Sequence, residues 1–202
     1  MAYREGEVVT VTPATGCGPG CQSCRGLRDA VTDLAYERGF EQVRAAEVIA
    51  RAGATPEAFA THAGSLEECL LAAYQQAGTE LVACFASAFA RPGDWHDRMA
   101  GATEAVLRQL AAHPAVAHLC YVEAARAGTR IRASRDEQMQ RAIEVMIAEH
   151  GDDGLPALRF ELIAGAVDRA IAARVSAGRL DELPALVDRI VEITAVFEPV
   201  AA

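Results

Sequence analysis

Lysine is absent from this chain of 202 residues, so all 19 residues in the lysine-plus-arginine total are arginines. The sequence also has 28 acidic residues, which give a formal net charge of -9. A negative field of this kind repels phosphate groups. The composition therefore excludes a protein that binds nucleic acid through its overall charge, and any DNA-binding role requires a separate basic face.

Long apolar runs are missing as well. No segment approaches the roughly 20 uncharged residues of a membrane span, and the N-terminal sequence MAYREGEVVTVTP lacks the basic-then-apolar layout of a signal peptide. The hydrophobic content of 51% is enough for one well-buried domain, or for one domain and a small appendage. We expect a globular cytoplasmic protein with no membrane partner.

Catalytic patterns are the third absence. The sequence has no Ser/His/Asp order, no phosphate-binding glycine loop and no metal-binding histidine spacing. His118 and Glu123 are a conceivable acid and base, but residues five apart do not share the face of an α-helix. We therefore nominate no catalytic residue, and an enzyme is the less favoured class.

The apolar residues that are present follow a helical period. From Leu27 onward they recur at spacings of three and four. Thr55 followed by Pro56, and Ser65 followed by Glu68, are start signals for helices. These patterns predict an all-α protein with about nine helices, at residues 27–38, 43–52, 56–62, 66–90, 94–113, 115–128, 130–150, 156–178 and 181–197. Residues 1–24 differ, and we expect an extended arm there.

Three of the six cysteines, Cys17, Cys21 and Cys24, lie in the glycine-rich stretch TGCGPGCQSC. Their spacing allows three thiolates to converge on one centre. One hypothesis is zinc or an iron–sulfur cluster, with a fourth ligand from another cysteine, a histidine, a second chain or a small molecule. A second is a redox pair of Cys21 and Cys24, and a third is an inert arm. The remaining cysteines are individually expected to be small core residues: Cys69, Cys84 and Cys120.

The stretch AYERGFEQVRAAEVIARAGATPEAFATHAGSLEECLLAAY, residues 35–74, resembles the N-terminal domain of the TetR family of transcription regulators. The matching features are Gly39-Phe40, the AGAT turn at 52–55, Phe59, and the Ser-x-Glu-x-x-Leu-Leu sequence from Ser65. The resemblance implies a helix-turn-helix domain over residues 25–66 and a helical ligand-binding and dimerisation domain over 67–202.

The resemblance also nominates residues for DNA contact, namely Arg44, Thr55, Glu57, Thr61 and His62. Arg44 stands where the family often uses a threonine against a phosphate, and Thr55 begins the presumed recognition helix. Both also have plainer interpretations, a solvated surface residue and an ordinary N-cap. Where the family usually carries a tyrosine and a lysine that hold phosphates, this chain has Ala60 and Leu66. Since residues 25–68 carry five arginines and eight acids, we expect weakened DNA binding.

For the C-terminal part, the family implies a small-molecule pocket and a homodimer built by the last two helices. Apolar stretches such as ELIAGAV and ALVDRIVEITAVF favour such association. Candidate pocket residues are Trp95, His96, His118, Tyr121 and Glu123. The sequence thus predicts a TetR-like regulator that responds to a small molecule or to a metal or redox signal at the cysteine arm. The alternative is a TetR-fold protein that no longer binds DNA and uses Cys17, Cys21 and Cys24 to hold a metal or iron–sulfur centre for catalysis or sensing.

Overall fold

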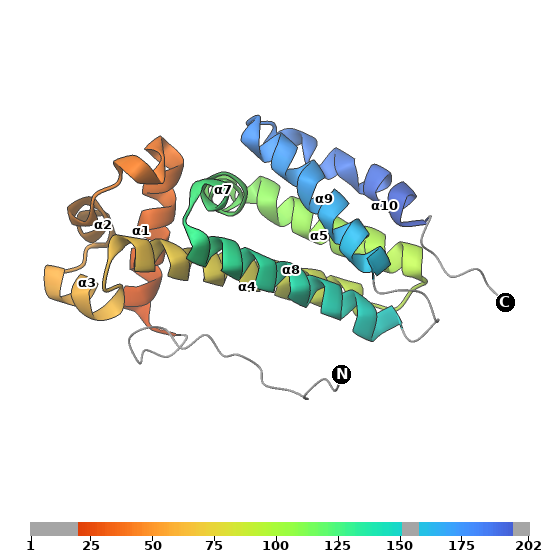
Figure 1. Ribbon diagram of the computed structural model, residues 1–202, viewed down its shortest axis with the longest axis horizontal. Helices are drawn as coiled ribbons and strands as arrows, with labels where there is room; N and C mark the ends of the chain where they lie inside the picture. The colour runs from red at the N-terminus through yellow and green to blue at the C-terminus, as the bar shows by residue number, and fades with distance from the viewer. Residues whose placement is uncertain (1–19, 151–157, 196–202) are drawn as a thin grey trace.

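The computed structural model describes residues 20–150 and 158–195 (Figure 1). The predicted arm lies outside these ranges up to residue 19, and Cys17 with it. The described residues contain helices and no strand, and they form nine helices when the continuous run α6–η2–α7 is counted once. The prediction of an all-α fold is confirmed.

The N-terminal unit is a helix-turn-helix packed on a preceding helix, at one end of the molecule (Figure 1). Its elements are α1 (Gln22–Arg38), the 3₁₀ turn η1 (Phe40–Gln42), α2 (Ala45–Ala52) and α3 (Pro56–His62). The first helix begins at Gln22, so the last residues of the predicted arm are helical and Cys24 is buried. Gly39 and Gly53 end α1 and α2 at positive φ, 83° and 62°, where a side chain would be strained. The Thr55 hydroxyl caps α3 by accepting a hydrogen bond from the Ala58 N–H at 3.2 Å.

The rest of the chain forms a bundle of long helices. Its elements are α4 (Leu66–Phe89), α5 (Trp95–Ala112), α6 (Pro114–His118), the π-helical turn η2 (Leu119–Glu123), α7 (Ala124–Arg126), α8 (Thr129–His150), α9 (Leu158–Ser176), the 3₁₀ turns η3 (Leu180–Glu182) and η4 (Pro184–Leu186), and α10 (Val187–Ala195). The long helices α4, α5, α8 and α9 run lengthwise beside one another (Figure 1). None of the described helices combines the length and the apolar character that crossing a bilayer requires.

The two units share a continuous core. Leu27, Val48 and Phe59 of the helix-turn-helix pack in one buried cluster with Leu70 of α4 and Leu119 of η2. The predicted boundary at residue 66 is the first residue of α4, so this one helix begins in the helix-turn-helix core and continues into the bundle. The turn η2 of the bundle therefore packs directly against α1.

Candidate functional site

A cavity of about 170 Å³ lies inside the bundle. Its walls come from α4, α5, η2, α8 and α9 and are mainly apolar. The apolar side chains include Leu81, Phe85, Met99, Met139 and Ile163. Pockets that bind small molecules are typically of this kind, apolar with a few convergent polar groups.

Four polar residues of the lining lie close enough to interact electrostatically. Arg135 of α8 forms an ion pair with Asp168 of α9, and Tyr74 and Tyr121 of the same lining interact with this pair. Burial opposes the charge on Arg135, but the hydrogen bond and the charge of Asp168 prevail and raise the pKa of Arg135. Burial raises the pKa of both tyrosines, so both are neutral donors at neutral pH. The wall thus offers hydroxyl donors beside a salt bridge.

The cavity contains one of the five predicted pocket residues, Tyr121. Trp95 lies in the first turn of α5, is not part of the lining, and packs against Phe89 with ring centroids 5.4 Å apart. His96 is exposed on the same turn. His118 and Glu123 do not line the cavity, because their side chains meet each other beside Tyr36 and Phe40 of the N-terminal unit.

The turn η2 explains how residues five apart come together. Its backbone is π-helical, and in a π-helix the hydrogen bonds join residues i and i+5. His118 Nδ1 consequently lies 3.7 Å from Glu123 Oε1. The expectation that His118 and Glu123 do not share a helix face was therefore wrong, since it assumed α-helical geometry. The wider turn also turns Cys120 and Tyr121 toward the cavity.

The same turn contacts the helix-turn-helix unit. The buried carboxylate of Glu123 accepts a hydrogen bond from the Phe40 N–H at 3.4 Å, at the end of α1. The Tyr36 ring of α1 meets the His118 ring edge-on, with centroids 5.6 Å apart. Burial lowers the pKa of His118, while Glu123 raises it and Arg126 lowers it. The segment from His118 to Glu123 therefore joins the cavity wall to α1 and to the turn η1 that follows it.

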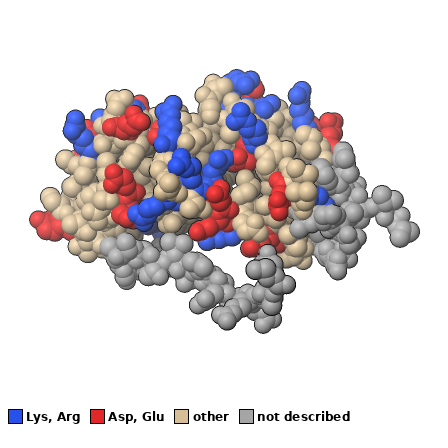
Figure 2. Space-filling model, in the orientation of Figure 1, with Lys and Arg blue, Asp and Glu red and all other residues tan. Residues whose placement is uncertain are grey.

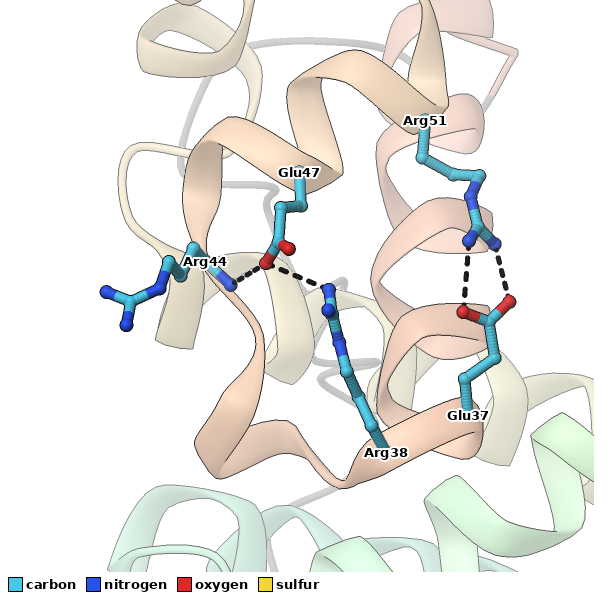
Figure 3. A network of polar contacts seen from close by, with 5 residues as sticks. All are labelled: Glu37, Arg38, Arg44, Glu47 and Arg51. Carbon is cyan, nitrogen blue, oxygen red and sulfur yellow. Dashed lines mark hydrogen bonds and ion pairs between the residues drawn. The ribbon is translucent and has the colours of Figure 1, made fainter.

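Two arginines of the helix-turn-helix unit are held by glutamates (Figure 3). Arg51 donates to both oxygens of Glu37, at 2.9 and 3.0 Å, and Arg38 lies 2.8 Å from Glu47. Glu47 also accepts the Arg44 N–H at the start of α2, at 2.9 Å. These pairs fasten α2 to α1 and occupy donors that a phosphate would otherwise take. The Arg44 guanidinium points away from the network (Figure 3).

The other residues predicted for DNA contact lie on or beside α3. Thr55, Glu57 and Thr61 are exposed there. Hydrogen bonds from its own N–H and from the Thr55 hydroxyl lower the pKa of Glu57, so the helix begins with a negative charge. On the face in Figure 2, the arginines and acids of the described residues are interspersed, with no continuous basic surface. DNA contact by these residues remains a prediction.

His62, also predicted to contact DNA, meets the cysteines instead. Its Nδ1 lies 3.7 Å from Cys21 Sγ and 3.5 Å from Cys24 Sγ. The three ligand atoms lie within 4.8 Å of one another. Cys69, considered as a fourth ligand, donates to the Leu27 carbonyl in the core instead, and Cys84 and Cys120 also lie outside this group.

Several cavity residues have no distinct signal in the sequence. Gln138, Arg135 and Asp168 look like ordinary surface positions of amphipathic helices, and only the packing of α8 against α4 and α9 brings them inward. Gly78 is a partial exception. A glycine inside a long predicted helix indicates a close approach, and a Cβ at Gly78 would lie 1.8 Å from Gln138 Oε1.

No protein-family model and no curated protein sequence matches the chain. Solved structures do. The fatty acid degradation regulator FadR from Bacillus halodurans superposes with a TM-score of 0.76 and 18% identity, covering 88% of this chain and 95% of that one. FadR from Bacillus subtilis, in complex with stearoyl-CoA, superposes with a TM-score of 0.72 and 15% identity, covering 84% of this chain and 96% of that one. A tetR-family regulatory protein from Rhodococcus RHA1 superposes with a TM-score of 0.64 and 17% identity, covering 90% of this chain and 100% of that one. The chain therefore has the fold of TetR-type transcription regulators.

Proposed function

We propose that the chain is a TetR-like transcription regulator whose DNA affinity is set by an apolar small molecule in the bundle cavity. The observation that carries the proposal is the turn η2, where Tyr121 lines the cavity and Glu123 binds the backbone of Phe40. A ligand that displaces Tyr121 should also move Glu123, which binds the turn η1 directly after α1. Such a role places the protein in the cytoplasm, with its DNA.

The chemistry of the cavity favours a ligand with a hydrocarbon body and a polar end. The apolar walls suit the body, and the neutral hydroxyls of Tyr74 and Tyr121 beside the Arg135–Asp168 pair suit the end. Fatty acyl compounds have this layout. The likeness to FadR, whose structure from Bacillus subtilis contains stearoyl-CoA, makes a fatty acyl thioester the first ligand to test.

The first experiment is a DNA-binding titration at about 50 mM salt, where phosphate contacts alone give measurable affinity. We expect weak binding that Arg44→Ala reduces further, with the salt slope falling by about one unit. Arg108→Ala is the matched control, because it removes an exposed arginine from α5 in the bundle. Stearoyl-CoA, with coenzyme A as control, is then added to the complex and should alter the affinity. Undetectable binding to both random and genomic DNA sinks the regulator proposal.

A second candidate function is supported by the grouping of Cys21, Cys24 and His62. In it, the protein holds zinc or an iron–sulfur centre at the cysteine arm, either as the signal for a regulator or in a TetR fold that no longer binds DNA. The helix-turn-helix unit is acidic, and two of its arginines, Arg38 and Arg51, are already paired with glutamates. Both features disfavour DNA binding and so favour this candidate. Zinc, iron and acid-labile sulfide content of anaerobically purified protein tests it directly, because protein lacking all three has no such centre.

A further inference from the structure

We infer that Cys21, Cys24 and His62 form a mononuclear zinc-type site that ties the end of the recognition helix α3 to the beginning of α1. This inference rests on the metal-holding function proposed above and does not depend on DNA binding. It makes His62 a metal ligand in place of a DNA contact, and it selects one ion over a multi-iron cluster.

The secondary structure brings the three ligands together. Cys21 precedes the first residue of α1 and Cys24 lies three positions further, so one turn presents both thiols on the same side. The amino end of a 17-residue helix also favours negative charge, which suits thiolates. His62 is the last residue of α3, and it reaches the start of α1 from 38 positions away in the sequence.

The two sulfur–nitrogen distances fit a single ion, and all three ligand atoms lie within 4.8 Å of one another. A tetrahedral zinc with Zn–S of about 2.3 Å and Zn–N of about 2.0 Å holds a sulfur and a nitrogen ligand atom about 3.6 Å apart. The two observed sulfur–nitrogen distances are 3.5 and 3.7 Å. Ligands of an iron–sulfur cluster bind different irons and lie further apart, so this compact group suits one ion better.

The donor set selects the metal class. Two thiolates and an imidazole are soft to intermediate ligands, which suit zinc and other late divalent transition ions and not magnesium or calcium. Both sulfurs approach the same nitrogen, Nδ1 of His62. Because zinc sites usually have four ligands, a fourth position remains for water or another ligand.

The site links the end of α3 to the beginning of α1 and so helps to fix the position of α3. α3 has only seven residues, and short helices depend on tertiary contacts for their stability. A metal bridge adds such a contact at its C-terminal end. Because metal binds the folded state, it should raise thermal stability, and above the dissociation constant the gain should grow with the logarithm of the metal concentration.

The test is titration of the metal-free full-length protein with Co²⁺, followed by competition with Zn²⁺. We expect one equivalent of cobalt, with thiolate charge-transfer absorption and the visible bands of a tetrahedral site, displaced by zinc. Cys24→Ser and His62→Asn should each weaken binding by at least about 100-fold, since losing a direct ligand costs more than losing an outer-shell partner. Cys84→Ser and His113→Asn are matched controls outside the group and should bind normally.

The outcomes separate this inference from the function on which it rests. Cobalt bound normally by the His62→Asn variant overturns the site while leaving a cysteine-held metal intact. Sulfide-containing protein overturns the mononuclear site but supports an iron–sulfur function. Protein that binds no cobalt while its circular dichroism shows a folded state overturns both. His62 is only half-buried, so its variant should fold even where the buried Cys24→Ser variant does not.

Discussion

Gly78 of α4 lies where the side chain of Gln138 from α8 crosses the helix. A Cβ at this position would come within 1.8 Å of the Gln138 amide. That amide is the end of a flexible side chain, so it can move away at little cost. The glycine therefore keeps Gln138 in its place in the cavity wall, and helix stability gains nothing from it, because glycine is a poor helix former.

We predict that Gly78→Ala separates stability from ligand binding. Alanine should stabilise α4 by up to about 1 kcal/mol, whereas the displaced Gln138 should lower ligand affinity by about tenfold, or about 1.4 kcal/mol. Thermal denaturation and calorimetric titration with stearoyl-CoA measure the two effects. Gly101→Ala on α5, with no atom within 4 Å of the new Cβ, is the control and should change stability alone. Unchanged ligand affinity in Gly78→Ala would show that Gln138 does not shape the binding site.

At the scale of elements, the termini of the helices follow local chemistry and were largely predictable. Thr55 and Ser65 both cap the helices that they were predicted to begin. The C-terminal helix is different, because the sequence predicts one helix over 181–197. The structure has two 3₁₀ turns before α10 begins at Val187, and the second of them starts at Pro184. Proline lacks the N–H that an α-helix uses, which accounts for the late start.

The turn η2 was not predictable from periodicity. Its sequence LCYVE has no glycine or proline, and an α-helix accommodates it equally well. In the structure this turn makes tertiary contacts that periodicity does not reveal, namely Tyr121 at the cavity and Glu123 at Phe40. A pattern that assumes 3.6 residues per turn therefore misplaces His118 and Glu123. It also misses the contacts that these two residues make with the helix-turn-helix unit. The cavity residues on α8 and α9 were missed for the same reason, since helix packing alone places them.

The contacts of His118 with the helix-turn-helix unit should make stability depend on pH. Burial lowers the pKa of His118 below its usual 6.5, although Glu123 opposes this and Arg126 adds to it. The unfolded chain then takes up a proton at a higher pH than the folded protein. Stability from this residue is complete above about pH 6.5 and decreases as the pH falls below it. The lowered carboxylate pKa values, such as that of Glu37, act only at lower pH.

We predict that the melting temperature of metal-free protein decreases between pH 7.5 and pH 5.5, and that His118→Gln reduces this decrease. The protein is treated with a chelator beforehand, so that loss of metal from His62 at low pH does not contribute to the change in melting temperature. His113→Gln changes an exposed histidine that contacts only its own helix and should leave the pH profile as it is. An identical profile in the His118→Gln variant contradicts the assignment.

At the scale of the whole molecule, α9 presents an apolar stripe to solvent. Leu158 and Leu162, one turn apart, are 57% and 54% exposed, and Gly165 and Ala166 continue the same face. Ile193 of α10 is also half exposed. Side chains of this type on adjacent helices are typical of association surfaces, and small residues let a second helix approach closely. The family resemblance implies the same pair of helices as the dimer interface.

We predict that the protein is a homodimer through α9 and α10, and that Leu162→Arg gives a monomer by placing an unpaired charge in the interface. Sedimentation velocity at micromolar concentration measures this, with Ala46→Arg, an exposed position on α2, adding the same charge elsewhere. A dimer that survives Leu162→Arg places the interface elsewhere.

Two-fold symmetry would set two α3 helices toward half-sites about one helical turn of DNA apart. In each copy, residues 25–68 carry five arginines and eight acids, and Arg38 and Arg51 are paired with glutamates. Tight DNA binding should therefore require both copies of the dimer. The monomeric variant should therefore lose DNA affinity while it still binds cobalt and ligand, because the metal group and the cavity each lie within one chain.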